Sequence, residues 1–175
     1  MHMVGSLEWV PAGERSDRLA EPVAEVIAGQ ADARVAEIDP GLADTEAFCE
    51  RYGVPLEISA NCVVIAAKRG GEVTYAACMI LATDRIDVNG IVRKHLGARK
   101  ASFAPMSEAT SLTGMEYGGI TPVGLPSDWP ILVDEKVAAA AEVVIGSGLR
   151  RSKILLPGKA LTTLPGAEVI ALAQA

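Results

Sequence analysis

Residues 113–122 (TGMEYGGITP), beyond the middle of the chain, combine residue types that can build an anion-binding loop. Neither Gly118 nor Gly119 carries a Cβ atom, so both can adopt positive φ and let the main chain approach a ligand. Pro122 fixes its own φ and biases Thr121 toward an extended conformation. We expect a stiff, bent loop whose exposed N–H groups could hold a carbonyl or an oxyanion. A tight turn between a helix and a strand uses the same residue types, and composition alone favours that simpler interpretation.

The side chains that most often supply a catalytic base or a metal site are scarce. The sequence contains two histidines and three cysteines, and no two cysteines form a CxxC pair. A disulfide framework or a zinc site is therefore not expected. Histidine-dependent catalysis would depend on His95, because His2 lies near the terminus, and we expect His95 to be exposed near a helix end. We predict chemistry that uses neither a metal nor an organic cofactor.

The length and composition predict one globular domain over residues 1–175, with 50% hydrophobic and 22% charged residues. Residues 1–15 show no clear period and are expected to be a loose lead-in. No apolar run reaches the roughly 18 residues of a membrane span, and the N-terminal residues do not read as a signal peptide. We expect a cytoplasmic protein without membrane attachment.

The net charge of −6 argues against a generic nucleic-acid binder, which is usually basic. It leaves open a protein that touches only one end of a tRNA. Two local basic clusters could make such a contact, although a solvated face is the simpler interpretation of both. The clusters are Arg93, Lys94, His95, Arg99 and Lys100, and then Arg150, Arg151 and Lys153.

Hydrophobic periodicity and turn residues predict an irregular alternation of helices and strands. The apolar runs 62–67 and 73–82, separated by a Gly-Gly turn, predict a hairpin in the middle of a sheet, with Lys68 in solvent at the turn. The other predicted helices are 21–28, 45–52, 88–96, 107–112 and 158–164, and the other predicted strands are 33–38, 101–104, 131–133, 142–145, 153–156 and 168–172. This order indicates an α/β (α+β) fold with a mixed, partly barrel-like β-sheet and helices packed outside.

The glycine-rich stretch resembles the motif of the YbaK/prolyl-tRNA synthetase-associated domain family, a group of editing domains that hydrolyse mischarged aminoacyl-tRNA. The resemblance covers roughly residues 32–172. It also includes residues 61–67 (NCVVIAA), 92–100 (VRKHLGARK) and 131–134 (ILVD). The glycine motif, in order with the strand before it and the aspartate after it, is fairly specific. The resemblance implies the same type of fold as the pattern of elements.

The resemblance also implies a set of site residues. Backbone amides near Gly118, Gly119 and Ile120 would polarise the ester carbonyl, with no protein nucleophile. Asp134 matches a family aspartate and could orient water or the substrate amine, or it could cap the helix that follows. The remaining matched positions would bind substrate or shape the pocket wall; they are Thr113, Gly114, Thr121 and Pro122.

One position departs from the family pattern. Family members usually carry a lysine just before the first core strand, near the 3′-terminal nucleotide of the substrate, and Asn61 occupies that position here. Asparagine is uncharged, so it cannot attract a phosphate or a developing oxyanion as an ammonium group would. Lys68 is no substitute, because the predicted hairpin places it at the far end of the strand.

The first functional hypothesis is a trans-editing deacylase that hydrolyses the ester of a small mischarged amino acid on tRNA. Its partners would be the acceptor end of tRNA and an aminoacyl-tRNA synthetase. The departure at Asn61 motivates the alternative, a catalytically weakened module of the same fold that binds an aminoacyl end or a free amino acid. A third hypothesis is a small-molecule ester or amide hydrolase that uses the same loop.

Overall fold

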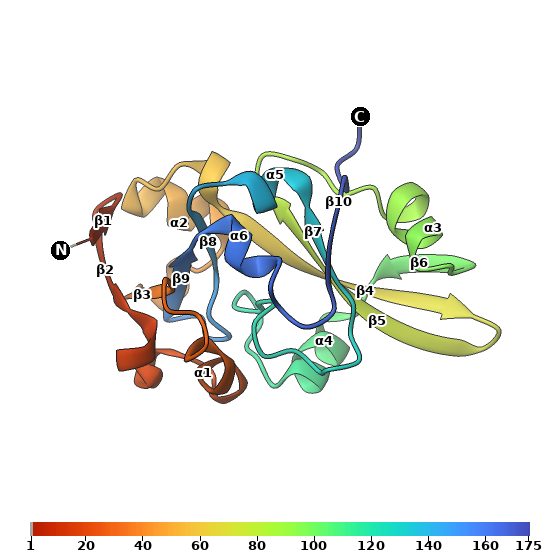
Figure 1. The fold of residues 1–175 in the computed structure, drawn as a ribbon, viewed down its shortest axis with the longest axis horizontal. Coiled ribbons are helices and arrows are strands. Elements are labelled where there is room, and N and C mark those ends of the chain that lie inside the picture. The colour runs from red at the N-terminus through yellow and green to blue at the C-terminus, as the bar shows by residue number, and fades with distance from the viewer. Residues whose placement is uncertain (1) are drawn as a thin grey trace.

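The computed structural model describes residues 2–175, which form two five-stranded sheets with short helices packed around them (Figure 1). The expected class is confirmed, because parallel and antiparallel strand pairs occur together and helices are packed around the sheets. No helix within the described residues is long and apolar enough to cross a membrane.

The first sheet has the strand order β1-β2-β3-β9-β8 and is antiparallel throughout. Its strands are β1 (His2–Val4), β2 (Leu7–Pro11), β3 (Arg34–Glu37), β8 (Val143–Gly146) and β9 (Ser152–Leu156). The strands β8 and β9 lie within about one residue of their predicted bounds. All five residues of β9 are buried, including Lys153, which the sequence placed in a basic cluster.

The expected loose lead-in is wrong for residues 2–15. This segment forms β1, β2 and a short 3-10 helix, Ala12–Glu14. Trp9 is 1% exposed, and Val10 pairs with Val35 of β3. Pairing with a distant strand and burial of an indole stabilise this segment, and neither is visible as a local period in the sequence.

The second sheet has the order β10-β7-β5-β4-β6 and is mixed, because β7 pairs in parallel with both β5 and β10. Its strands are β4 (Ala60–Arg69), β5 (Glu72–Leu81), β6 (Lys100–Phe103), β7 (Ile131–Asp134) and β10 (Ala167–Ile170). The predicted hairpin is confirmed as the central pair β4–β5. Its turn uses Gly70 and Gly71 at φ of 57° and 84°, in the region that favours glycine.

The two sheets meet where β4 begins. Ser59, directly before β4, forms an isolated parallel bridge with Val144 of β8. From this junction the β4–β5 hairpin extends away from the first sheet, as Figure 1 shows. The start of β4 is therefore held between both sheets, and its far end projects outward.

The helices are short and lie on the outside of the sheets (Figure 1). They are α1 (Glu21–Ile27), α2 (Thr45–Tyr52), α3 (Arg93–His95), α4 (Met106–Thr113), α5 (Glu135–Ala139) and α6 (Gly158–Leu161). A π-helical turn, Val88–Val92, precedes α3 and receives a cap from Asp87. The predicted end of α2 at residue 52 is confirmed, and Gly53, which follows it, has φ of 67°. The helix α4 extends one residue beyond its predicted bounds at each end, and Pro105 is its N-cap residue.

Candidate functional site

A cleft of about 370 Å³ opens where the two sheets meet. It is lined by the start of α2, the start of β4, the glycine loop and the facing ends of β8 and β9. Three of the predicted site residues, Asn61, Gly118 and Ile120, line this cleft together. The other lining residues are Ala43, Asp44, Thr45, Ala60, Cys62, Val63, Tyr117, Gly146 and Lys153.

The glycine loop brings unpaired main-chain donors to the cleft lining. The amide of Gly119 donates to the Glu116 carbonyl at 2.9 Å and closes a turn. Within residues 2–175, the amides of Gly118 and Ile120 have no protein acceptor, and both residues line the cleft. The predicted set of three donors is thus divided: Gly118 and Ile120 can receive a ligand oxygen, and Gly119 maintains the turn.

Packing explains why two adjacent glycines stand in this loop. Gly118 adopts φ of 81°, and a Cβ atom there would lie 2.3 Å from a terminal nitrogen of Arg150. Gly119 has no positive φ, but its Cβ would lie 2.8 Å from the main chain of Leu149. The Gly119 carbonyl also accepts a 2.6 Å hydrogen bond from the Gly148 amide. Leu149 and Gly148, in the turn between β8 and β9, therefore pack directly against the loop and restrict its conformation.

Asn61 lines the same cleft as the loop, and its side-chain oxygen accepts a 2.6 Å hydrogen bond from the Thr45 hydroxyl. That contact ties β4 to the first turn of α2. It leaves the amide NH₂ of Asn61 as the group that can donate to a ligand, because the side-chain nitrogen carries two hydrogens. Asn61 therefore adds a neutral donor to the cleft that Gly118 and Ile120 also line.

Lys153 is the cleft residue that sequence reasoning missed. We expected a solvated basic cluster, and that expectation is wrong for this lysine, which is 7% exposed. Its ammonium group donates to the Ala43 carbonyl at 2.7 Å and lies 5.3 Å from the centre of the Phe48 ring. Burial lowers the pKa of Lys153 to about 8, although Cys49 and Asp44 oppose the shift. The lysine thus brings a cation into the cleft from β9, whereas the family pattern places one on β4.

The cysteine thiols near the cleft are poor nucleophiles. Burial raises the pKa of Cys62, which lines the cleft beside Asn61, and the neighbouring Cys78 acts in the same direction. Burial also raises the pKa of Cys49, against a smaller opposing effect of its Ser59 contact. Because the thiolate is the reactive form, both thiols stay protonated at neutral pH. Residues 2–175 contain no group of three His, Cys, Asp or Glu side chains that could hold a metal ion.

Five other predicted positions lie in the glycine loop or directly before it, and they do not line the cleft. Thr113 is buried, and its hydroxyl donates to the Ala109 carbonyl and accepts from the Met115 amide. Gly114 ends α4 at φ of 69°. Thr121 is 0% exposed, and its hydroxyl has no partner within the described residues. The two remaining positions are Pro122, which is buried, and Gly119.

Asp134 lies at the end of β7, outside the cleft lining, and is 1% exposed. One carboxylate oxygen accepts from the Lys136 amide at 3.1 Å, and the other accepts from the Leu172 amide at 2.8 Å. These contacts cap α5 and hold the chain after β10. They match the capping role that the sequence left open beside the catalytic one.

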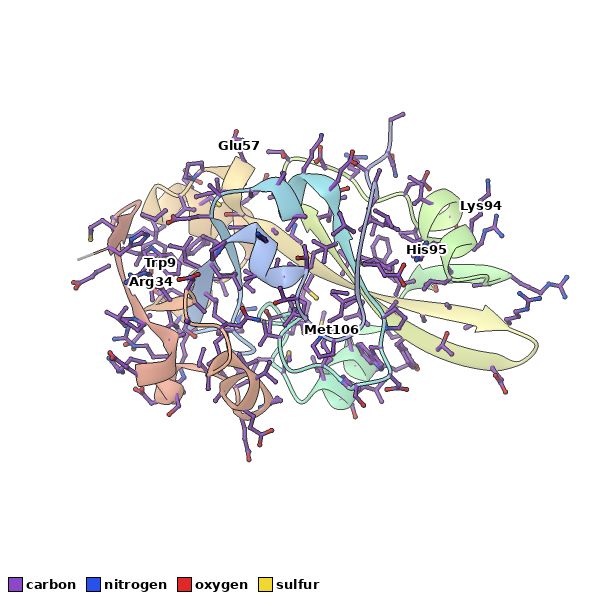
Figure 2. All side chains as sticks on the ribbon, viewed as in Figure 1. Trp9, Arg34, Glu57, Lys94, His95 and Met106 are labelled. Carbon is purple, nitrogen blue, oxygen red and sulfur yellow. The ribbon has the colours of Figure 1, made fainter. Side chains whose placement is uncertain are left out.

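The first basic cluster lies at the other end of the molecule. Lys94 and His95 lie on α3, far from Trp9 of the first sheet, as Figure 2 shows. His95 contacts Glu168 at 2.9 Å and does not line the cleft. Lys68 and Lys100 face each other as direct cross-strand partners on β4 and β6. The expected position of Lys68, at the opposite end of β4 from Asn61, is confirmed.

The architecture is shared with proteins of known structure. It superposes on the crystal structure of a candidate trans-editing enzyme for prolyl tRNA synthetase with a TM-score of 0.75 and 22% identity, over 89% of this chain and 97% of that one. A hypothetical protein of known structure gives a TM-score of 0.77 and 21% identity, over 88% and 100% of the two chains. At these identities the likeness shows the fold alone.

The family follows from sequence. A family model described as "Aminoacyl-tRNA editing domain" matches residues 39–164, and the chain belongs to this family. Among its relatives is the proline–tRNA ligase of Burkholderia ambifaria (strain MC40-6), 30% identical over 73% of this chain. The enzyme of Burkholderia multivorans is 29% identical over the same share. The chain spans 22% of the length of each ligase.

Proposed function

We propose that this chain is a trans-editing deacylase that hydrolyses the ester between a small mischarged amino acid and tRNA. Residues 1–175 would act as one editing domain. The observation that carries the proposal is the cleft that Asn61 lines together with Gly118 and Ile120, whose amides are unpaired within residues 2–175. Family membership supports it, because the matched model describes an aminoacyl-tRNA editing domain.

In this proposal the amides of Gly118 and Ile120 donate to the ester oxygen as it becomes negatively charged. Donors that are already oriented need no reorganisation, and each is typically worth about 2.7–4 kcal/mol of barrier. Water supplies the attacking oxygen, because the thiol of Cys62 stays protonated. The NH₂ group of Asn61 would hold the ribose or the ester from the opposite wall.

The direct test is a deacylation screen with tRNA acylated by alanine, cysteine, serine or proline. We expect release of at least one of these amino acids at a rate well above spontaneous hydrolysis. Comparison with the matching amino acid ester that lacks tRNA separates an editing enzyme from a small-molecule hydrolase. Equal rates on both substrates would favour the hydrolase.

The alternative is a binding module of the same fold that has lost catalysis, and the specific observation behind it is the neutral Asn61 in the cleft. Such a module would bind an amide-linked aminoacyl adenosine, which cannot be hydrolysed. Binding of that analogue without turnover of any acylated tRNA would select the module over the deacylase.

We further propose that the basic end of the β4–β5 hairpin contacts the tRNA backbone. Directly opposed like charges such as Lys68 and Lys100 destabilise a sheet, and a polyanion would relieve that repulsion. Lys and Arg contacts to phosphates supply most sequence-independent affinity for nucleic acid. The synthetase that charges this tRNA is the expected protein partner, and the cytoplasm is the expected location.

A further inference from the structure

The ammonium group of Lys153 has no carboxylate partner in the cleft. Within residues 2–175, no Asp or Glu oxygen lies within 4.0 Å of its nitrogen. The contact with the Ala43 carbonyl uses one of its three N–H donors. The other two N–H donors remain available to a ligand. The ammonium group as a whole is mostly removed from water, and burying a charge without a counter-ion is costly in free energy.

Asp44 attracts the Lys153 ammonium group from beyond 4.0 Å, but its carboxylate already has another cationic partner. A carboxylate oxygen of Asp44 lies 3.7 Å from a terminal nitrogen of Arg150. Arg150 in turn donates to the carbonyls of Pro40 and Tyr117, at 3.2 and 3.0 Å. Asp44 therefore cannot neutralise Lys153 on its own, and the cleft retains an unpaired positive charge.

The lining residues differ in exposure. Asp44, Asn61 and Tyr117 are exposed, and Gly118 and Ile120 are half-buried. Lys153 is buried, as are Ala43 and Ala60, and we infer that these three form the floor of the cleft. An ester that reaches the amides of the glycine loop from the entrance would direct its acyl side chain toward this floor.

We propose that Lys153 forms a carboxylate-binding subsite at the floor of the cleft, and that the preferred acyl group is aspartyl or glutamyl. A buried ammonium and a buried carboxylate are each costly alone, and pairing them relieves both costs. Hydrogen bonds between such ions are also stronger than those between neutral groups. The inference deepens the proposed function and depends on it for the position of the ester.

A binding experiment tests the subsite without requiring turnover. The probes are 3′-amide-linked aspartyl adenosine and its alanyl counterpart, measured by titration calorimetry with the intact chain. We expect the aspartyl probe to bind the unaltered protein about ten- to a hundredfold more tightly, the range of a hydrogen bond to a charged group. Lys153→Met should abolish this preference, and Lys159→Met, at an exposed lysine on α6, should retain it.

Equal affinity of the unaltered protein for the two probes would overturn the subsite. So would a preference that persists in Lys153→Met. Lys153→Gln provides a second neutral side chain if the methionine variant does not fold.

Deacylation of aspartyl and alanyl RNA minihelices separates this inference from the proposed function. Selective loss of aspartyl turnover in Lys153→Met supports the subsite, and equal loss for both esters overturns it, because the ammonium would then act on the ester itself. A Lys153-dependent aspartyl preference in binding, without hydrolysis of either ester or of any acylated tRNA in the deacylation screen, would support the subsite and refute the deacylase.

Discussion

The Thr45 hydroxyl donates to the Asn61 side-chain oxygen at 2.6 Å, so the first turn of α2 fixes the orientation of the residue that replaces the family lysine. Without this bond the amide of Asn61 could rotate and present either its oxygen or its nitrogen to a ligand. Because the Asn61 side-chain oxygen already accepts from Thr45, its side-chain NH₂ group is the one that can donate to a ligand in the cleft.

Thr45→Val should therefore lower kcat/KM for deacylation by about two- to tenfold, the equivalent of one neutral hydrogen bond. Thr110→Val is a matched control, because its hydroxyl donates only to carbonyls within α4. Equal rates in both variants would show that the orientation of Asn61 does not matter.

Asn61→Lys restores the residue type that the family usually carries. If the deacylase proposal holds, this variant should deacylate at least one acylated tRNA of the screen faster than the unaltered protein does. The gain should appear in single-turnover rates. A slower variant would indicate that a second ammonium in a cleft that already holds Lys153 repels the substrate amine.

Gly118→Ala should reduce deacylation strongly, by about a hundredfold or more, because the displaced main chain would misplace its donors. The control is Gly53→Ala, at the end of α2 and outside the cleft lining. Gly53 also has a positive φ, of 67°, and the nearest atom to its added Cβ, in Gly5, would lie 3.9 Å away. Both variants should lose stability from the strained φ, Gly118→Ala more so because of its close contact with Arg150, and only Gly118→Ala should lose activity. Thermal unfolding and initial rates check the two expectations, and full activity in Gly118→Ala would refute the loop assignment.

Lys153 should make stability depend on pH in alkaline solution. Its pKa is about 8 in the folded protein against an ordinary value of 10.5. Between these values the unfolded chain binds more protons, so the contribution of Lys153 to stability rises with pH. Below pH 8 the full cost of the buried charge remains, on the order of 3 kcal/mol.

Urea unfolding at pH 7 to 10 can measure this effect as a difference between the unaltered protein and Lys153→Met. The difference cancels the contributions of Cys62 and Cys78, whose thiols ionise in this pH range in the unfolded chain of both proteins. The unaltered protein should gain stability relative to Lys153→Met as pH rises from 8 to 10. A constant difference would contradict the lowered pKa.

Lys100→Glu should change stability and tRNA binding in opposite directions. Replacing the cross-strand partner of Lys68 with an acid removes a repulsion, so the protein should become slightly more stable. Affinity for tRNA should fall, and its dependence on salt should weaken. Lys159→Glu alters the net charge equally at another exposed lysine and should leave tRNA binding nearly unchanged.

Asp134→Ala should destabilise the protein by about 2 kcal/mol or more, because two main-chain donors lose their acceptor. Specific activity of the folded protein at low temperature should be nearly unchanged. Loss of activity in a folded Asp134→Ala protein would restore the catalytic role that the family resemblance suggested.

Local signals in the sequence were sufficient for much of the fold. The Gly70-Gly71 pair predicts the β4–β5 hairpin, and Gly53 predicts the end of α2, because each glycine adopts the positive φ that its position requires. The strands β1 and β2 could not be predicted in the same way. The strand β2 is stabilised by pairing with β3, a contact between segments about 25 residues apart, and β1 pairs in turn with β2.

Less of the candidate site than of the fold could be predicted from the sequence. Residue types predicted that the glycine loop carries free amides, but which amides are free depends on how Leu149 and Gly148 pack against it. Lys153 was missed because charged residues are seldom buried and because it follows two arginines. The one available signal was its place within SKILL, a segment apolar enough to form a strand buried on both faces.

The strand β4 begins at the cleft and ends at the basic turn of the hairpin, with Asn61 near one end and Lys68 near the other. An extended strand advances about 3.3 Å per residue, so these two residues are separated by about 23 Å along a rigid, central element. A ligand that engages both must be at least that long. An aminoacyl nucleotide released from its enzyme is too short, whereas an acylated RNA stem can reach both ends, so β4 would discriminate between substrates by their length.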